Sequence, residues 1–456
     1  MFLEKIKSKG LAHLSYIIGD KSRAAVIDPR RDCGIYREIA DREGCRITYI
    51  FETHRNEDYV TGSTELAART GAAIRHGRAL PFQYGEVVKD GDEFILGDII
   101  LKILETPGHT YESISIVLYD KSSGDSPVAV FSGDALFIRD TGRTDFFPGR
   151  ERETAGLLYD SIFNKILPLG DGTIIFPAHG AGSVCGAGLS AREFSTLGHE
   201  RLHNPSLQWR DREEFINFKL KETHHLPPYF KEMEKLNLEG APVIGLLPEP
   251  SPYGPDDFAA ASEKSMVILD IRSPEAVSGA YIPGSLVIPL EMIPSFAGWF
   301  LSYDKPIGLL PEDRRQVEDA VRYLFRIGYE KIPAFLEGGL HAWEISGRKY
   351  DRIPAIHAAE IVKKITGGDD FTLLDVRSPE EFETGYLPGA VNIYLGELPR
   401  RLNEIPDSRP LITFCGSGER AIIAASILKI NGFSDVEVCL GSMAACSAIG
   451  CPISGI

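Results

Sequence analysis

The stretch Val267-Ile268-Leu269-Asp270-Ile271-Arg272-Ser273-Pro274-Glu275 returns 105 positions later as Thr372-Leu373-Leu374-Asp375-Val376-Arg377-Ser378-Pro379-Glu380. A second pair, Tyr281-Ile282-Pro283-Gly284 and Tyr386-Leu387-Pro388-Gly389, has the same spacing. This self-similarity predicts two copies of a domain of about 100 residues. Each copy alternates short apolar runs with amphipathic segments such as residues 420–430, which is typical of βα units around a parallel sheet.

The composition is that of a globular protein with several domains. The chain has 456 residues, of which 43% are hydrophobic and 25% charged, so roughly two to four cores are expected. Its net charge of −16 disfavours a phosphate backbone or an anionic membrane surface as the main partner. We therefore expect small-molecule partners, no nucleic acid and no membrane, and the sequence leaves homo-oligomerisation open.

Cysteine use and the N-terminus indicate the compartment. The seven cysteines are odd in number and scattered, which does not suit a disulfide framework and favours a reducing, cytoplasmic location. Met1-Phe2-Leu3-Glu4-Lys5-Ile6-Lys7 lacks the apolar core of a signal peptide. No run of about 18 apolar residues predicts a membrane span.

Proline marks a boundary near the middle of the chain. Five prolines lie between Pro242 and Pro255, and proline lacks the N–H group that helices and central strands need. We interpret residues 244–257 as an extended linker. The predicted domains are then residues 1–243, 258–351 and 352–456, the last two being the repeats.

One cysteine lies in a loop that suits thiol chemistry. The loop Cys415-Gly416-Ser417-Gly418-Glu419-Arg420 joins an apolar strand at residues 411–414 to a helical pattern at residues 421–430. A helix N-terminus directs backbone N–H groups and the positive end of its dipole at such a loop. With the cation of Arg420, these groups would stabilise a thiolate and then a persulfide on Cys415. The alternative is a buried structural cysteine, which the two glycines and the arginine disfavour.

This loop and two further motifs resemble rhodanese domains. The pattern Cys-x-x-Gly-x-Arg at residues 415–420 is accompanied by Asp375-Val376-Arg377 and Leu387-Pro388-Gly389. Over residues 259–456, the resemblance implies two rhodanese-like copies and a sulfurtransferase that carries a persulfide on Cys415. It makes Cys415 and Arg420 catalytic and assigns the loop glycines, Gly416 and Gly418, to substrate binding.

The first copy departs from that pattern. Its equivalent loop is Pro311-Glu312-Asp313-Arg314-Arg315-Gln316, and no cysteine occurs between Asp257 and Tyr350. The first copy therefore has no thiol to carry a sulfane sulfur. We expect it to be a non-catalytic packing or docking domain.

In the first part of the chain, side chains suited to metals follow four apolar runs. They are His54 and Asp58 after residues 47–51, His109 after 100–104, Asp134 after 128–131, and His179 after 174–176. With helical segments such as residues 63–69 between some strands, the pattern predicts an α/β sandwich whose strand-end loops carry the polar residues. A lone loop histidine is usually structural, but three histidines and an aspartate at four strand ends predict a shared metal.

These segments resemble the metallo-β-lactamase superfamily, whose fold is an αββα sandwich and whose first motif is His-x-His-x-Asp-His. His54 and Asp58 match that motif, whereas Asn56 and Tyr59 replace its second and last histidines. In two-metal members such as glyoxalase II, each metal uses one of the replaced histidines. Each site therefore loses one ligand in this chain.

What remains is His54, His109 and Asp134, the set found as the facial triad of non-haem Fe(II) oxygenases, which leaves positions open for O₂ and a thiolate substrate. Persulfide dioxygenases of the superfamily look like this. The resemblance assigns one Fe(II) per chain to the three residues, with zinc as the alternative in protein as isolated. Asp58 and His179 are secondary ligand candidates.

Two further residues are candidates for substrate binding, each with a structural alternative. Arg143 either binds a substrate carboxylate or forms a structural salt bridge. Cys185, in the glycine-rich segment 180–186, either accepts a persulfide near the iron or is a small residue in a turn.

The domain order resembles bacterial persulfide dioxygenase–sulfurtransferase fusions. The implied function is oxidation of a low-molecular-weight persulfide by O₂ to sulfite or thiosulfate in sulfide detoxification. Cys415 would take sulfur from sulfane-sulfur donors and either feed the iron site or join sulfur to sulfite to give thiosulfate. Two alternatives stay open. One is a two-metal thioester hydrolase of the glyoxalase II type. The other is a sulfide-responsive binding protein with a decayed first domain that retains only sulfurtransferase activity.

Overall fold

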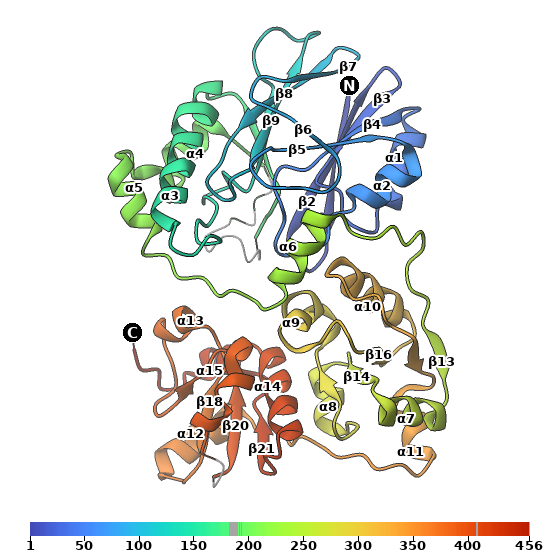
Figure 1. The fold of residues 1–456 in the computed structure, drawn as a ribbon. Helices are drawn as coiled ribbons and strands as arrows, with labels where there is room; N and C mark the ends of the chain where they lie inside the picture. The colour runs from blue at the N-terminus through green and yellow to red at the C-terminus, as the bar shows by residue number, and fades with distance from the viewer. Residues whose placement is uncertain (182–189, 191, 193, 407–408, 456) are drawn as a thin grey trace. The chain divides into compact units, whose positions relative to one another are not determined.

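The computed structural model describes residues 1–181, 190, 192, 194–406 and 409–455. The chain forms two compact units (Figure 1). One consists of Met1–Leu246 with Arg326–Gly328, and the other of Leu247–Phe325 with Tyr329–Ile456. Each unit is described by itself below.

The first unit contains two six-stranded sheets. In sheet order, the first consists of β1 (Phe2–Ser8), β2 (His13–Asp20), β3 (Arg23–Ile27), β4 (Arg46–Phe51), β5 (Ala73–His76) and β6 (Glu86–Val87). The second consists of β12 (Ser195–Thr196), β11 (Ile174–Pro177), β10 (Ala129–Gly133), β9 (Ile114–Asp120), β8 (Ile99–Glu105) and β7 (Glu93–Leu96).

Side-chain alternation along the strands builds three cores. In β2, Tyr16 and Ile18 join a core with Leu101 of β8 and Phe131 of β10, so this core lies between the sheets. Ile17, on the opposite face of β2, packs with residues of α1 (Gly34–Arg42) and α2 (Ser63–Thr70). A third core joins the outer face of the second sheet to α3 (Glu151–Ser161), α4 (Leu197–His203) and α5 (Arg212–Lys219). A strand whose two faces enter different cores follows from the period of two in side-chain direction.

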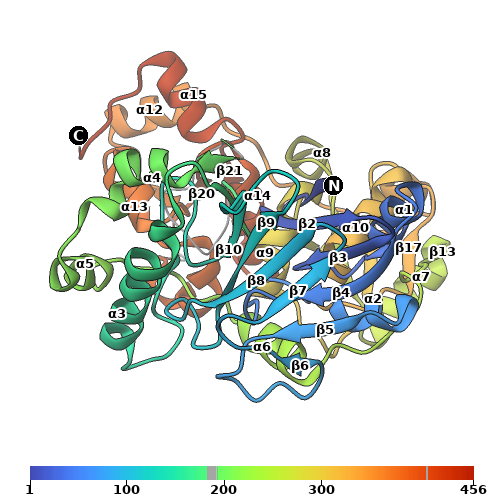
Figure 2. The ribbon, with the colours of Figure 1, turned by 90° about the horizontal axis from the view of Figure 1, so that it is seen from above.

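The helices complete a four-layer sandwich. Figures 1 and 2 show α1 and α2 outside the first sheet and α3, α4 and α5 outside the second. A further helix, α6 (Phe230–Glu239), ends the unit. The αββα architecture predicted for the first part of the chain is confirmed.

The second unit contains the two repeats, each with its own parallel sheet. The strands of the first are β13 (Ser251–Tyr253), β17 (Ala334–Leu336), β16 (Ile307–Leu310), β14 (Val267–Asp270) and β15 (Leu286–Val287). Those of the second are β19 (Val391–Asn392), β18 (Thr372–Asp375), β20 (Leu411–Phe414) and β21 (Val436–Val438). The helices are α7 (Pro255–Lys264), α8 (Pro274–Gly279), α9 (Ile293–Phe300), α10 (Arg315–Arg326), α11 (Gly339–Ile345), α12 (Ala358–Gly367), α13 (Pro379–Glu383), α14 (Glu419–Ile430) and α15 (Ser442–Ile449). The predicted α/β repeats are confirmed.

The helix α14 is buried on every side. All of its residues from Ala421 to Leu428 are buried, so this helix is apolar around its whole circumference and the amphipathic pattern expected for residues 420–430 is not observed. One side packs on β20 and β21 of its own repeat, and another contacts β15 and α8 of the first repeat. The backbone N–H of Val287 donates to the Ser426 hydroxyl across this contact at 3.2 Å. The first repeat therefore covers the helix that follows the Cys415 loop, which supports the packing role predicted for it.

The proline-rich segment differs in part from the expected linker at residues 244–257. Ser251–Tyr253 forms β13, which pairs with β17 in parallel, and α7 begins at Pro255. Proline is tolerated here because β13 is an edge strand and because Pro255 lies at a helix N-terminus. The exact domain boundaries stay a prediction.

The helices are short relative to a bilayer. The longest α-helices, α10 and α14, have 12 residues each, whereas a membrane-spanning helix needs about 20. Within the described ranges, no helix is long and apolar enough to cross a membrane. The cellular location stays a prediction.

Substitution of Gly108, which precedes His109, tests how closely the loop after β8 packs on α3. Gly108 has a φ of +145°, and a Cβ there would lie 2.4 Å from the Leu158 Cα. We expect Gly108→Ala to lower the free energy of unfolding by about 3 kcal/mol, because it combines backbone strain with overpacking. Gly34→Ala, which meets open space at the start of α1, should change it by less than about 1 kcal/mol. Thermal unfolding of both variants measures the difference, and equal shifts would contradict this packing.

Candidate functional site

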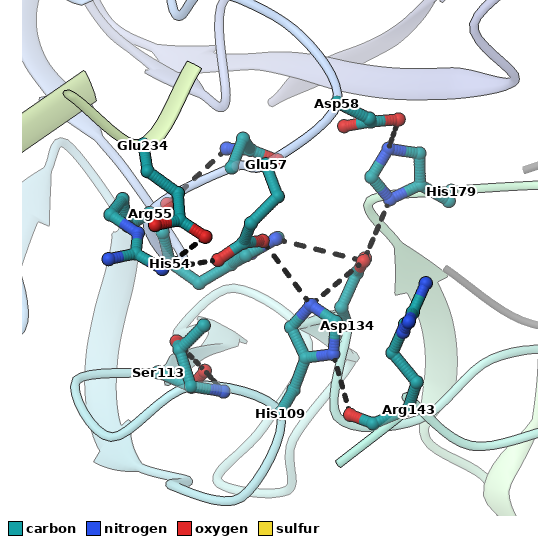
Figure 3. A network of polar contacts seen from close by, with 12 residues as sticks. His54, Arg55, Glu57, Asp58, His109, Ser113, Asp134, Arg143, His179 and Glu234 are labelled. Carbon is teal, nitrogen blue, oxygen red and sulfur yellow. Dashed lines mark hydrogen bonds and ion pairs between the residues drawn. The ribbon is translucent and has the colours of Figure 1, made fainter. Parts of the chain in front are cut away.

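The chemistry-bearing residues of the first unit gather at one end of the sandwich. The strands β8, β10 and β11 run in the same direction, since β8 and β10 are both antiparallel to β9 and β11 is parallel to β10. Their C-terminal ends therefore carry the loops of His109, Asp134 and His179 to the same edge. The loop after β4, in the other sheet, adds His54. The predicted convergence of these four residues is thus observed (Figure 3).

Three of them offer ligand atoms to a common point. The His54 Nε2 lies 3.7 Å from the Asp134 Oδ2, and the His109 Nε2 lies 3.5 Å from the same oxygen. Within the described residues, ligand atoms of His54, His109 and Asp134 form a group whose members all lie within 4.8 Å of one another. All three side chains are buried.

The tautomer of His54 is fixed by a chain of hydrogen bonds. Asp28, directly after β3, accepts hydrogen bonds from the Thr53 N–H at 2.7 Å and the Thr53 hydroxyl at 2.8 Å. Since that hydroxyl has a single proton and donates it to the carboxylate, it accepts from the His54 Nδ1 at 3.0 Å. The proton of the imidazole is therefore on Nδ1, and the lone pair is on Nε2, facing Asp134.

His109 is held in the same way by a backbone carbonyl. Its Nδ1 lies 3.0 Å from the carbonyl oxygen of Arg143, which can only accept. The His109 Nε2 therefore also carries a lone pair. Metal-bound histidines typically donate their other N–H to such a carbonyl or carboxylate.

These atoms fit a metal ion. Within the described part of the chain, neither the His54 Nε2 nor the His109 Nε2 has a hydrogen-bond partner, although both are buried and buried polar atoms are rarely left unsatisfied. Burial lowers the pKa of His54 to about 3 and the pKa of His109 to about 4. Both imidazoles are therefore neutral at physiological pH, which is the state that binds metals.

His179 forms ion pairs with two carboxylates, those of Asp134 and Asp58. The His179 Nδ1 lies 2.8 Å from the Asp134 Oδ1, and its Nε2 lies 3.1 Å from the Asp58 Oδ2. Burial works against a charge on His179, but the carboxylates of Asp134 and Asp58 outweigh it and raise the pKa of His179 well above its ordinary value. Burial alone would raise the pKa of Asp134, yet the neighbouring imidazoles, that of His179 first, lower it. The two carboxylates therefore favour the imidazolium form of His179, whose Nδ1 donates to Asp134 and whose Nε2 faces Asp58.

Asn56 and Tyr59, which replace the two motif histidines, make contacts within and around their own loop. Tyr59 packs against the ring of His13 in a tilted arrangement, with centroids 4.0 Å apart, and burial raises the pKa of its phenol well above the ordinary value. Asn56 turns its amide nitrogen toward the carbonyl of His54 at 3.3 Å. Both side chains therefore support the loop.

Glu57 was not singled out from the sequence, yet it faces the site. Its Oε2 lies 3.8 Å from the His109 Nε2, and its Oε1 accepts from Arg55 at 3.0 Å. Arg55 also pairs with Glu234 of α6 at 3.4 Å. Burial raises the pKa of Glu57 well above its ordinary value, although Arg55 acts in the opposite direction. No local signal in the sequence separates Glu57 from its polar neighbours.

Asn237 was also missed, although the sequence offers a signal for it. Its amide nitrogen donates to the carbonyls of Asn56 and Tyr59, both at 2.7 Å, and its oxygen accepts from the Thr61 N–H at 2.9 Å. Asn237 follows Phe230 and Met233 at helical spacing on the buried face of α6. A polar residue at such a core position indicates a specific hydrogen-bond role. Here it fixes the loop that carries His54.

The two substrate-binding candidates have different outcomes. The Arg143 guanidinium forms a bidentate pair with Asp145, at 2.6 and 2.7 Å, and donates to the carbonyl of His225 at 3.2 Å. This is the geometry of a structural salt bridge, and a role in substrate binding stays a prediction. Cys185 lies outside the described residues, so its role also stays a prediction.

The Cys415 loop lies between β20 and α14, as the sequence predicts. The backbone N–H of Gly418 points at the Cys415 Sγ at 3.1 Å, and the Cys415 N–H donates to the Ser442 hydroxyl at 3.0 Å. Gly418 has a φ of +108°, and a Cβ there would lie 2.0 Å from the carbonyl oxygen of Leu440. Only glycine fits this turn.

Arg420 closes one side of the loop. A Cβ on Gly416 would lie 3.1 Å from the Arg420 guanidinium, so glycine permits this close approach. Arg420 also forms a bidentate pair with Glu381, at 2.5 and 2.8 Å. Burial works against its charge, but the hydrogen bonds to Glu381 outweigh that effect and raise the pKa of Arg420. The guanidinium is a permanent cation beside the thiol loop.

The equivalent loop of the first repeat is filled by its own side chains. The Gln316 amide oxygen accepts from the N–H groups of Glu312 at 2.8 Å and Asp313 at 3.3 Å. The Asp313 carboxylate accepts from the Arg315 N–H at 2.8 Å. In the first repeat, three backbone N–H groups of this loop are thus satisfied by the side chains of Gln316 and Asp313.

Comparison with protein families agrees with this division. Residues 9–179 match the family described as the metallo-beta-lactamase superfamily. Residues 254–346 and 358–448 each match the rhodanese-like domain. The resemblances inferred from the sequence motifs are confirmed.

Individual relatives narrow the family further. Persulfide dioxygenase ETHE1, mitochondrial, of Bos taurus is 35% identical over 232 residues, which is 49% of this chain and 77% of the relative. The Homo sapiens protein of the same name is 35% identical over 201 residues, covering 42% of this chain and 70% of the relative. A crystal structure of a metallo-beta-lactamase from Staphylococcus aureus subsp. aureus COL is 32% identical and aligns with a TM-score of 0.66 over 74% of this chain and 98% of that one.

The lowered pKa values predict a pH effect on the metal-free protein. His54 and His109 have folded pKa values of about 3 and 4, against about 6.5 in an unfolded chain. Between pH 6.5 and about 4 the unfolded state binds more protons, so the free energy of unfolding falls as the pH falls, by up to about 1.4 kcal/mol per pH unit for each histidine. His54→Gln should flatten this dependence, and the exposed-site variant His203→Gln should keep it. Urea unfolding across this range measures the slopes, and equal slopes in wild type and His54→Gln would contradict the assignment.

Proposed function

Because this chain belongs to the ETHE1-related part of the metallo-beta-lactamase superfamily and carries two rhodanese-like domains, we propose that it is a persulfide dioxygenase coupled to a sulfurtransferase. Its first domain oxidises a low-molecular-weight persulfide with O₂ at one Fe(II) bound by His54, His109 and Asp134. Its last domain moves sulfane sulfur on Cys415. The combined products are sulfite and thiosulfate, and the role is sulfide detoxification.

The observation that carries this proposal is the pair of unpartnered imidazole lone pairs. Two neutral histidines and one charged aspartate form a buried donor set for a single divalent ion. Fe(II) with two histidines and one carboxylate supplies O₂-activating chemistry and leaves adjacent positions for a second reactant. The printed names of the ETHE1 relatives support the same chemistry.

The arrangement of His179 favours one ion over two. Both of its ring nitrogens face carboxylates, those of Asp134 and Asp58. As an imidazolium it has no lone pair to offer a metal, and its positive charge offsets the two carboxylates. Tyr59, a protonated phenol, replaces the remaining imidazole of a second site. These features disfavour the two-metal thioester hydrolase.

The proposed oxidation balances without a further redox partner. A persulfide anion, O₂ and water give a thiolate, sulfite and two protons: R–S–S⁻ + O₂ + H₂O → R–S⁻ + SO₃²⁻ + 2 H⁺. The S–S bond breaks, and the terminal sulfur is oxidised while O₂ is reduced. In this chain, the Thr53 hydroxyl and the Arg143 carbonyl orient the two imidazoles, and His179 holds Asp134. Positioning of this kind lowers the barrier by making the encounter intramolecular.

The second reaction uses the Cys415 loop. A persulfide on Cys415 transfers its terminal sulfur to sulfite: Cys415–S–S⁻ + SO₃²⁻ → Cys415–S⁻ + S₂O₃²⁻. The S–S bond of the persulfide breaks and a new one forms in thiosulfate. The Gly418 N–H, which points at the sulfur, and the Arg420 guanidinium stabilise the anions on both sides of the reaction.

The two activities should be separable by mutation. We expect His109→Ala to abolish O₂ consumption with a small persulfide because it removes a metal ligand, while leaving thiosulfate:cyanide sulfurtransferase activity intact. Cys415→Ser should abolish the sulfurtransferase activity and leave most O₂ consumption, whereas Cys45→Ser should retain both. An oxygen electrode and a thiocyanate assay measure the two rates. Loss of O₂ uptake in both His109→Ala and Cys415→Ser would show one obligatory relay and contradict two separable sites.

The first domain should bind one iron per chain. His54→Ala, His109→Ala and Asp134→Ala each remove a donor and should empty the site, while His179→Ala should retain some iron because His179 contacts Asp134 and Asp58 and is not one of the three donors. Elemental analysis of protein purified without oxygen gives the stoichiometry. Two equivalents of zinc per chain, both required for thioester hydrolysis, would instead establish the hydrolase. Absence of metal after reconstitution with iron would favour the decayed binding protein.

A further inference from the structure

Three further cysteines lie close together in the second repeat. Cys439 and Cys446 are fully buried, Cys451 is partly buried, and all three pack in the core of that repeat. Cys439 also interacts electrostatically with Cys415 and Cys451, so the sulfur atoms gather in one part of the domain. The sulfurtransferase reaction proposed for Cys415 uses none of these three thiols.

The end of helix α15 brings the backbones of Cys446 and Cys451 together. Gly450, with a φ of +71°, ends the helix, and its N–H donates to the carbonyl of Cys446. The Cys451 N–H donates to the same carbonyl oxygen at 3.0 Å, as in other glycine-terminated helices. Standard bond lengths on either side of this contact keep the Cα atoms of Cys446 and Cys451 within about 7 Å of each other. Disulfide partners usually have Cα atoms about 4.4–6.8 Å apart.

The side chains of the same two cysteines also meet. A side-chain hydrogen bond joins the thiols of Cys446 and Cys451. Burial, and then this hydrogen bond, raise the pKa of Cys446 above its ordinary value, so Cys446 keeps its proton and donates it to the Cys451 sulfur. The Cys439 sulfur is held differently, because it accepts the backbone N–H groups of Gly441 and Ser442.

The chain around Cys451 is fixed, yet a small molecule can reach this thiol. Backbone groups of Tyr386 and Ser454 exchange hydrogen bonds at 2.8 and 3.0 Å, which anchors the segment after Cys451. Residues 447–450, between the two cysteines, are exposed, whereas Cys446 lies in the core. Cys451 is therefore the outer thiol of the pair and Cys446 the inner one.

A shared metal ion does not explain the three cysteines. Among the residues that the structure describes, the group of three donors close enough to hold one ion is His54, His109 and Asp134. The three cysteines do not form such a group. Two thiols in contact, one accessible and one buried, instead suit thiol–disulfide chemistry.

We propose that Cys446 and Cys451 form a reactive dithiol, which a low-molecular-weight persulfide oxidises to an intramolecular disulfide with release of sulfide. The outer thiol first takes up the terminal sulfur: Cys451–SH + R–S–S⁻ → Cys451–S–S⁻ + R–SH. The inner thiol then attacks: Cys446–SH + Cys451–S–S⁻ → Cys446–S–S–Cys451 + HS⁻. The persulfide S–S bond breaks, the protein disulfide forms, and the proton of Cys446 leaves with the sulfide. The two cysteines lose two electrons, which the sulfane sulfur gains.

This reaction goes beyond the proposed function and needs neither the metal, O₂ nor Cys415. It takes place on the helix that also supports the sulfurtransferase loop. In the first turn of α15, the N–H groups of Met443 and Ala444 donate to the carbonyls of Cys415 at 3.1 Å and Gly416 at 2.9 Å. The dithiol lies at the other end of the same helix. A persulfide that reaches this domain can therefore either load Cys415 or be reduced to sulfide.

The test uses the metal-free full chain carrying Cys415→Ser, treated with glutathione persulfide without oxygen, so that neither proposed activity contributes. Sulfide release is measured, and the remaining thiols are then alkylated. The tryptic peptide of residues 430–456 contains Cys439, Cys446 and Cys451 and no other cysteine, so its mass counts the thiols left. We expect one alkylated cysteine in this peptide after treatment, and all three after a further treatment with dithiothreitol.

Three further substitutions in the same Cys415→Ser chain identify the pair. Cys446→Ala and Cys451→Ala should each lose the disulfide and release about one equivalent of sulfide per chain less than their parent. Cys439→Ala, in the same core and the same peptide, is the matched control and should retain both. Thermal unfolding checks each fold, and Cys451→Ala, at a partly exposed position, keeps the test decisive if Cys446→Ala does not fold.

Three results would overturn the dithiol. The first is a treated parent chain in which all three cysteines of the peptide are still alkylated. The second is an equal loss of the disulfide in Cys439→Ala and Cys451→Ala, which would assign the bond to another pair. The third is a persulfide that stays on Cys451 without sulfide release, which would show that Cys446 does not attack it. None of these results bears on iron binding or on O₂ consumption, so the proposed function is tested separately.

Discussion

The first domain depends on two buried imidazole nitrogens whose lone pairs converge on one point and receive no hydrogen bond from the described residues. The Nε2 atoms of His54 and His109 converge on Asp134 and lack hydrogen-bond partners within the described chain. Such an arrangement is unfavourable without a cation, so the fold must anchor each ring by its other nitrogen. The anchors are the Thr53 hydroxyl for His54 and the Arg143 carbonyl for His109. They lie on loops from different sheets, and only a closed sandwich brings them together.

A second set of contacts explains how the loop after β4 tolerates two motif substitutions. Asn237 of α6 binds backbone groups of Asn56, Tyr59 and Thr61, so the loop keeps its path whatever side chains occupy those positions. Tyr59 packs against the ring of His13. His179 lies between Asp58 and Asp134 and pairs with both carboxylates.

The two candidate sites offer a place for negative charge or a cation by different means. In the first domain, two imidazoles and a carboxylate are buried together as a donor set for a cation. In the last domain, the Gly418 N–H points at the Cys415 Sγ and the Arg420 guanidinium lies beside the loop. The helix α14 is apolar around its circumference because its own sheet and the first repeat both cover it. The repeat without a cysteine therefore contributes to the thiol site through packing, and its own loop donors are satisfied by Gln316 and Asp313.

The sequence by itself determined the repeats, the αββα class, the Cys415 loop and the set His54, His109, Asp134 and His179, because periodicity, glycine positions and strand-end polar residues are local signals. The strand Ser251–Tyr253, inside the segment interpreted as a linker, depends on pairing with β17, a strand more than 80 residues away. The tertiary structure alone decided that His179 is shared by two carboxylates, that Arg143 pairs with Asp145, and that Glu57 faces His109. Groups from distant strands decide the direction in which a side chain points. They also decide whether its partner is a proton, a carboxylate or a metal. No local pattern in the sequence encodes those distances.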